Sequence, residues 1–166
     1  MMSFPRLAAL PLALLLLAPA PGAAESARSL PAPLGTTELM VSDRASGLGL
    51  SGFDPVTFQV DGVPRPGRPE RELVWGGVAW RFAGNANLEA FRRDPAGFAP
   101  RLGGYDATAM ADGRLVAGDP RFFRVEEGRL YVFRDEAARD RFAAEPGLGA
   151  AAEARWPAVR DGLVRF

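Results

Sequence analysis

The strongest constraint on the fold is an internal similarity between two parts of the chain. At a constant offset of 51 residues, six positions carry the same or a similar residue without a gap. They are Gly77, Trp80, Phe82, Ala86, Phe91 and Pro95, which pair with Gly128, Tyr131, Phe133, Ala137, Phe142 and Pro146. Upstream, residues 54–62 and 119–128 both read Asp-Pro-x-x-Phe-x-Val followed by acid and glycine. The pattern predicts two structural units that fold alike.

Each unit reads as a strand, a turn, a second strand and a helix. The Asp-Pro blocks would form the first strands, and in the first unit residues 63–76 would be an insertion in the turn. Alternating aromatic residues at 78–82 and 130–133 indicate the second strands. Helices are predicted over 85–93 and 135–144, because Pro95 and Pro146 stop them. We therefore expect an α+β fold in which two ββα units, related by an internal repeat, pack their helices on an antiparallel sheet.

The first residues predict a targeting segment. Arg6 supplies one positive charge, residues 7–17 are apolar, and small residues precede Glu25, so residues 1–24 read as a signal peptide cleaved after Ala24. An uncleaved N-terminal anchor is the alternative. We expect a periplasmic or secreted protein. Residues 25–47 read as a linker or extended lead-in, and 48–163 as one domain: half one 50–100, a glycine loop 101–118 and half two 119–163.

Composition limits the chemistry available to this domain. The 166 residues include no cysteine, no histidine and no lysine. These residue types supply most nucleophiles, Schiff-base amines and transition-metal ligands in proteins. The formal net charge is +0, so a nucleic-acid partner or an anionic membrane surface is not implied. We expect no enzyme activity, no required cofactor and no membrane-embedded part after signal cleavage, although a bound metal ion stays possible.

A glycine pair in the centre of the domain marks the candidate ligand site. Gly103, Gly104, Tyr105 and Asp106 follow one another, and adjacent glycines allow positive φ and close approach of the backbone. An ordinary turn is the simpler interpretation of such a pair. We take these four residues as candidates for binding a ligand.

Several motifs resemble those of YHS-domain proteins, of the exported type in which one YHS-like module fills nearly the whole mature chain. They cover about 110 residues, in this order: Ser51-Gly52-Phe53-Asp54-Pro55-Val56, Val78-Ala79-Trp80-Arg81-Phe82-Ala83, Gly103-Gly104-Tyr105, Gly118-Asp119-Pro120, Gly128-Arg129-Leu130-Tyr131 and Ala154-Arg155-Trp156-Pro157.

The resemblance implies metal binding through groups that this chain lacks. The family typically has a cysteine or selenocysteine after Gly-Gly-Tyr, and many members have a histidine before the Trp-x-Phe element. Here Asp106 stands at the thiol position and Leu73 stands about where the histidine would fall. A copper or zinc site of the family type is therefore not expected.

Three functions stay open at this point. The first is an exported, non-catalytic YHS-like domain that binds a protein partner or a small ligand near Gly103–Asp106. The second is a hard-cation site, for calcium or magnesium, in which Asp106 is helped by other acids. Weak candidates for that role are Asp54, Asp112 and Asp119, although an Asp before proline more often opens a turn. The third is a carboxylate-dependent hydrolase with Asp106 as acid or base. Its sugar groove would be lined by Trp75, Trp80, Tyr105 and Tyr131.

Overall fold

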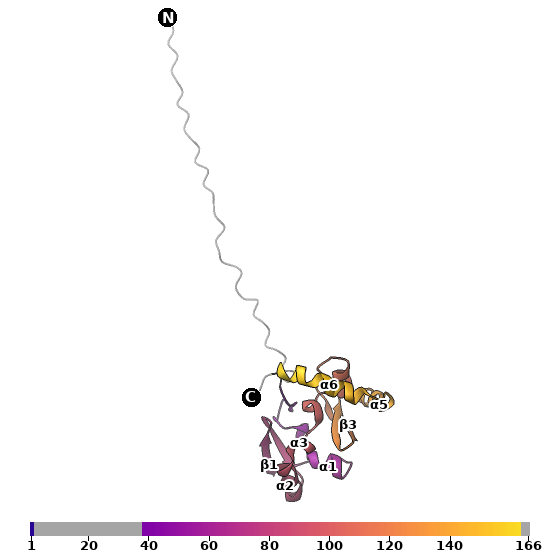
Figure 1. Ribbon diagram of the computed structural model, residues 1–166. Helices are drawn as coiled ribbons and strands as arrows, with labels where there is room; N and C mark the ends of the chain where they lie inside the picture. Colours follow the sequence, from indigo (N-terminus) through magenta and orange to yellow (C-terminus); the bar gives the residue numbers. More distant parts are fainter. Residues whose placement is uncertain (2–37, 164–166) are drawn as a thin grey trace. The chain divides into compact units, whose positions relative to one another are not determined.

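The computed structural model describes residue 1 and residues 38–163, so the predicted signal peptide and residues 25–37 lie outside the described residues. Two β-hairpins and several helices make up the described domain (Figure 1). The elements are η1 (Leu50–Gly52), α1 (Pro55–Val60), β1 (Arg68–Trp75), β2 (Val78–Phe82), α2 (Asn85–Arg93), α3 (Pro95–Phe98), η2 (Arg101–Gly104), α4 (Ala107–Ala111), β3 (Asp119–Glu126), β4 (Arg129–Phe133), α5 (Glu136–Ala144) and α6 (Leu148–Asp161).

The two hairpins have the same register. In the first, Arg68 pairs with Phe82 and Trp75 with Val78, and in the second the residues 51 positions later make the same pairs. Both have a bulge at the same place, between Arg68 and Glu72 and between Asp119 and Phe123. The α+β class and the antiparallel pairing are confirmed. Within residues 38–163 the hairpins form two separate two-stranded sheets, where the sequence had suggested one sheet.

The helices that follow the hairpins are those that the sequence predicts. Helix α2 covers Asn85–Arg93, and α5 covers Glu136–Ala144 with Asp135 as its N-cap. The Asp135 carboxylate accepts a hydrogen bond from the amide N–H of Ala138, which satisfies one free donor of the first turn. Phe91 and Phe142 are buried on the inner faces of these helices. Each packs on the second strand of its hairpin, with ring centroids 5.2 Å apart for Phe82–Phe91 and 5.0 Å for Phe133–Phe142.

The predicted strand over residues 54–62 is wrong, because this segment is helix α1. The Asp54 side chain caps the helix and Pro55 occupies its first turn, where the absent N–H of proline costs nothing. The first strand of this half is β1, inside the stretch that the sequence assigned to an insertion. Asp119 and Pro120, although alike in sequence, open a strand instead. The two Asp-Pro blocks therefore have different structures.

The glycine segment 101–118 also contains regular structure. It folds as η2, followed by α4 and an extended stretch up to β3. This order repeats the order of η1, α1 and β1 in the first half. In both 3-10 turns three consecutive residues have positive φ: +48°, +52° and +83° for Leu50–Gly52, and +56°, +64° and +83° for Leu102–Gly104. The positive φ expected of Gly103 and Gly104 is confirmed.

Strand β4 separates two hydrophobic cores. Leu130 and Val132 belong to the first core, with Trp80, Phe82 and the helices of the first half. Tyr131 and Phe133 belong to the second core, built mainly from η2, α4, α5 and α6. Because successive side chains of a strand point to opposite faces, β4 is buried on both sides and its sequence is continuously apolar after Arg129.

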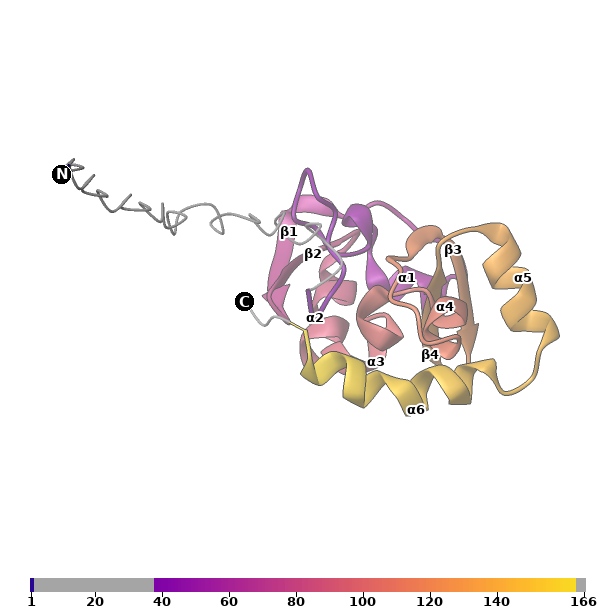
Figure 2. The same ribbon diagram turned by 90° about the horizontal axis from the view of Figure 1, so that it is seen from above.

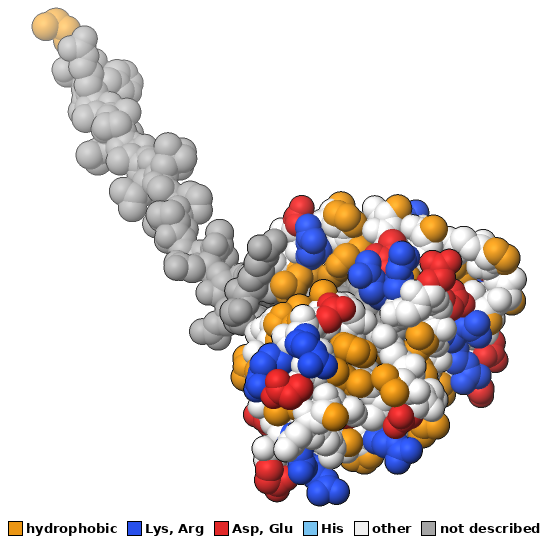
Figure 3. Space-filling view, turned by 60° about the horizontal axis from the view of Figure 1, so that its bottom comes forward, with side chains coloured by type: hydrophobic (Ala, Val, Ile, Leu, Met, Phe, Trp, Pro, Cys, Tyr) orange, Lys and Arg blue, Asp and Glu red, His pale blue; other side chains and the backbone are white. Residues whose placement is uncertain are grey.

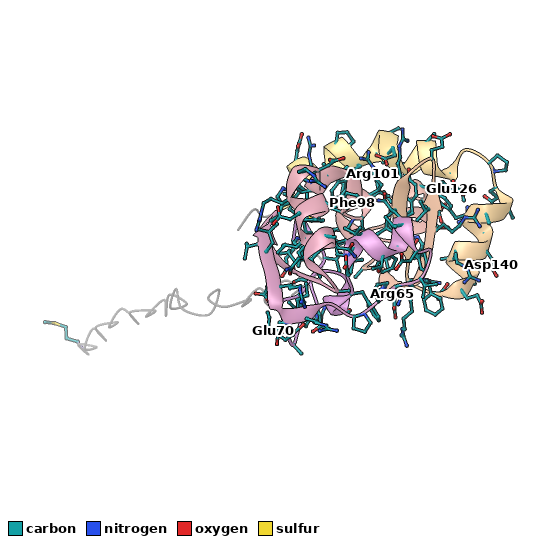
Figure 4. All side chains as sticks on the ribbon, turned by 90° about the horizontal axis from the view of Figure 1, so that it is seen from below. Arg65, Glu70, Phe98, Arg101, Glu126 and Asp140 are labelled. Atoms are coloured by element: carbon teal, nitrogen blue, oxygen red, sulfur yellow. The ribbon has the colours of Figure 1, made fainter. Side chains whose placement is uncertain are left out.

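Helix α6 closes the second core. It lies beside α4 along one side of the domain (Figure 2). Arg101 of η2 holds it through a bidentate ion pair with Glu153, at 2.7 and 2.8 Å, and Figure 4 shows Arg101 next to this helix. The Tyr131 hydroxyl donates to the same carboxylate. Burial by itself raises the pKa of Glu153, but the ion pair with Arg101, the hydrogen bond from Tyr131 and the charge of Arg129 together outweigh burial, so that the pKa is lowered. Among the described helices, none is long and apolar enough to cross a membrane.

We predict that Gly67→Ala and Gly118→Ala each lower the free energy of unfolding by about 1–3 kcal/mol, because each new methyl group would have to displace its neighbours. A Cβ at Gly67 would overlap the backbone of Arg81, and one at Gly118 would lie 2.6 Å from a methyl group of Val132. Urea denaturation measures the effect. Gly162→Ala is the control, since its φ is −88° and the nearest atom to its Cβ, the carbonyl oxygen of Val159, lies at an ordinary contact distance of 3.5 Å. Equal stability of all three variants would contradict the prediction.

Candidate functional site

The Asp106 side chain is fully buried, and both of its carboxylate oxygens accept backbone hydrogen bonds. The amide N–H of Ala109 donates to Oδ1 at 2.9 Å, which caps helix α4. The amide N–H of Arg134 donates to Oδ2 at 3.0 Å, which ties the end of β4 to the same helix. With 0% of its surface exposed, this carboxylate holds two segments of the fold together.

Asp54 makes the corresponding bonds in the first half. Its Oδ1 accepts from the amide N–H of Val56 at 2.9 Å and caps α1, and its Oδ2 accepts from the amide N–H of Ala83 at 2.8 Å. The side-chain amide of Asn87 adds a third bond, at 2.7 Å. This carboxylate is also 0% exposed. Residues 50–54 and 102–106 share the sequence Leu-x-Gly-aromatic-Asp, a signal that relates Asp54 to Asp106.

The other residues of the glycine candidate site contact the lead-in. The Tyr105 hydroxyl donates to the carbonyl oxygen of Glu38 at 2.5 Å, and the amide N–H of Val41 donates to the carbonyl of Gly103 at 2.7 Å. A side chain at Gly103 would overlap the carbonyl oxygen of Leu39. Glycine is therefore needed here for close approach as well as for positive φ. The last residues of the lead-in are part of the folded domain.

The acidic candidates are dispersed. Asp112 pairs with Arg141 at 2.7 Å and with Arg114 at 3.2 Å. Asp119 pairs with Arg121, whose guanidinium lowers the pKa of this carboxyl, opposed by partial burial. Asp54 and Asp106 lie in separate halves of the domain, and their carboxylates accept the backbone hydrogen bonds described above. Within residues 38–163 no three acidic side chains come together in a group that could hold a metal ion.

The aromatic candidates for a sugar groove are core residues. Trp80, Tyr105 and Tyr131 are between 0% and 4% exposed, and the partly buried Trp75 packs edge-on against Phe91. Burial raises the pKa of Tyr105 to about 12, with a further contribution from Glu38. Burial also raises the pKa of Tyr131. These side chains fill the two cores, and none of them lines the cleft described next.

A cleft of about 490 Å³ lies beside Gly104, between the lead-in, η1 and the start of β3. Its lining combines buried apolar side chains with a polar rim. The lining residues are Val41, Ser42, Asp43, Arg44, Leu50, Ser51, Phe53, Pro100, Gly104, Ala117, Gly118, Asp119, Pro120, Arg121 and Val132. Gly104 and Asp119 are thus the members of the sequence-predicted set that line a cavity. The other lining residues come from five separate segments, and no single motif in the sequence marks them.

The ordered contacts of the rim fix its shape. The Asp43 Oδ1 accepts hydrogen bonds from the amide groups of Ala45 and Ser46 and from the Ser46 hydroxyl, which closes the turn of the lead-in. Asp119 holds Arg121 through Nε and Nη2. The Arg121 guanidinium also lies 5.8 Å from the ring centre of Phe122. The rim is therefore largely preformed.

A comparison with protein-family models, with curated proteins and with solved structures gave no match for this chain.

We predict that Asp54→Asn and Asp106→Asn each lower the free energy of unfolding by about 2–3 kcal/mol. An amide has one acceptor oxygen, so its NH₂ group would face a buried backbone N–H that loses its partner. Chemical denaturation of each variant checks this. The control is Asp94→Asn at the exposed N-cap of α3, where asparagine caps as well as aspartate does and stability should change by less than about 0.5 kcal/mol. Equal stability of buried and exposed variants would refute the capping role.

We predict that stability falls as pH rises from about 10 to about 12. The folded state favours the neutral phenol of Tyr105, because its pKa is raised to about 12, whereas tyrosine in an unfolded chain titrates near 10. The stabilisation is therefore complete below pH of about 10 and lost as pH passes through the folded pKa. Urea denaturation from pH 8 to 11.5 should show a smaller fall in Tyr105→Phe. The residual fall should come from Tyr131. An unchanged pH dependence in Tyr105→Phe would exclude this cause.

Proposed function

We propose that this chain is an exported, non-catalytic binding domain that resembles the YHS family and holds a small ligand in the cleft beside Gly104. Export rests on the signal-like residues 1–24. The resemblance to the YHS family rests on the motifs around Gly52, Trp80, Gly104 and Trp156. The single observation that carries the binding role is the cleft itself, which five separate segments of the chain build around a buried apolar floor.

We also propose that the domain consists of two copies of one module, which arose by duplication. Equal register of the hairpins, equal placement of the bulge and the paired bonds of Asp54 and Asp106 support this view. In each copy, an amide N–H at the first strand donates to the glycine of the 3-10 turn, from Gly67 to Gly52 at 2.8 Å and from Gly118 to Gly104 at 3.0 Å. The cleft lies where η1 of the first copy meets β3 of the second.

Asp106 has a structural role, and this favours ligand binding in the cleft over a reaction at Asp106. The residue at the family's thiol position is a buried cap, equivalent to Asp54, and it has no exposed surface. The cleft, in contrast, is open to a ligand, and its volume lies in the usual range of ligand pockets, about 300–1,000 Å³. Its buried floor residues Leu50, Pro100 and Val132 would contact the apolar part of that ligand.

We predict that a neutral probe binds in the cleft and that filling the cleft abolishes binding. Phenol added to the ¹⁵N-labelled mature domain should shift the amide resonances of Val41, Gly104 and Gly118. The variants Ala117→Phe and Ser42→Phe each add a ring to the cleft lining from a different segment of the chain, and both should remove these shifts. Two-dimensional NMR spectra also show directly whether each variant is folded.

The matched control adds the same ring at a surface position outside the cleft. Val63 is 57% exposed and does not line the cleft, so Val63→Phe should leave the phenol shifts unchanged. Shifts that spread over the whole surface would overturn the proposed function. Shifts that persist in both folded cleft-filling variants would do the same.

A further inference from the structure

The rim of the cleft carries charges of both signs in equal number. Asp43, Arg44, Asp119 and Arg121 all line it. On the surface shown in Figure 3, acidic and basic side chains are likewise interspersed, and neither sign dominates that face. A ligand with a single charge would meet attraction from two rim groups and repulsion from the other two. The charge pattern therefore favours a ligand that carries both signs.

Two of the four charges already satisfy each other. Asp119 and Arg121 form an ion pair with N–O distances of 2.5 to 3.0 Å. This pair is anchored to the backbone, because the amide N–H of Arg121 also donates to Asp119. Its net charge toward a ligand is close to zero. It forms one polar wall of the cleft.

The other two charges keep hydrogen-bonding capacity. Asp43 accepts its three bonds through Oδ1, and within residues 38–163 its Oδ2 accepts none. The exposed Arg44 has no ion pair or side-chain hydrogen bond with any other residue of that range. The hydrogen bonds from Ser46 lower the pKa of Asp43, and this carboxylate, like an ordinary aspartate, is ionised near neutral pH. One acceptor and one donor of opposite charge thus stand on adjacent residues of the lead-in.

We propose that the cleft binds a small zwitterion with an apolar body, such as a short apolar peptide with free ends. Arg44 would hold its carboxylate and Asp43 its ammonium group, while Leu50, Phe53 and Val132 would contact its side chains. The cleft of about 490 Å³ has room for a molecule of that size. This inference rests on the proposed function, and it makes the lead-in part of the binding site.

The test is a calorimetric titration of the mature domain with the dipeptide leucylphenylalanine and with two blocked forms, the N-acetyl derivative and the C-terminal amide. Loss of one charge-assisted contact should weaken binding of each blocked form about tenfold or more. Asp43→Asn keeps an oxygen for the turn and removes the charge, and Arg44→Gln removes the guanidinium. N-acetylation should cost nothing further in Asp43→Asn, and amidation nothing further in Arg44→Gln.

The control is Arg93→Gln, which removes an exposed arginine of α2 outside the cleft and should leave all three affinities unchanged. Equal binding of free and blocked peptides would overturn the inference. So would a penalty for blocking that persists in both variants, or the absence of any binding by the free peptide. If phenol still shifts the cleft amides in any of these cases, the proposed function stands and only the zwitterion assignment fails.

Discussion

The fold depends on two buried carboxylates that each join three segments of the chain. Asp54 and Asp106 cap the helix that follows them, and each also accepts the first amide after a hairpin. Their own backbone amides donate to Arg65 and Val116, just before the first strand of each hairpin. One residue therefore fixes a helix start, a strand start and a strand end. Such a carboxylate is stabilising only because every bond is made, since an unpaired buried charge is costly.

The second strand of each hairpin and the helix after it were predicted from the sequence because their signals are local, whereas α1, α3, α4, α6 and the first strand β1 were not predicted. Alternating aromatic residues predicted the second strands at 78–82 and 130–133, where the structure has Val78–Phe82 and Arg129–Phe133, and prolines marked the ends of the helices that follow. Helix α1 was missed because Asp-Pro opens helices and strands alike. The shared Leu-x-Gly-aromatic-Asp sequence aligns Asp54 with Asp106, and the equivalent long-range hydrogen bonds of the two side chains show that these segments correspond.

The candidate site was only partly predictable, for a physical reason. Gly103 and Gly104 were identified as a special backbone, and the structure explains the need for it through the close approach of the lead-in. The resemblance to YHS-domain proteins placed Asp106 at a ligand position, whereas its hydrogen bonds make it the N-cap of α4. The cleft is built by residues far apart in sequence, from Val41 to Val132, and contacts between such segments leave no periodic pattern.

The double burial of β4 bears on how the domain unfolds. Since Leu130 and Val132 complete one core while Tyr131 and Phe133 complete the other, neither half can open without exposing a face of the same strand. Two modules of similar build would otherwise be free to melt separately, as weakly coupled repeats do. Because both cores share strand β4, each core can stay packed only while the other does. A cleft at their meeting point thus keeps its walls together until the whole domain comes apart in one cooperative step.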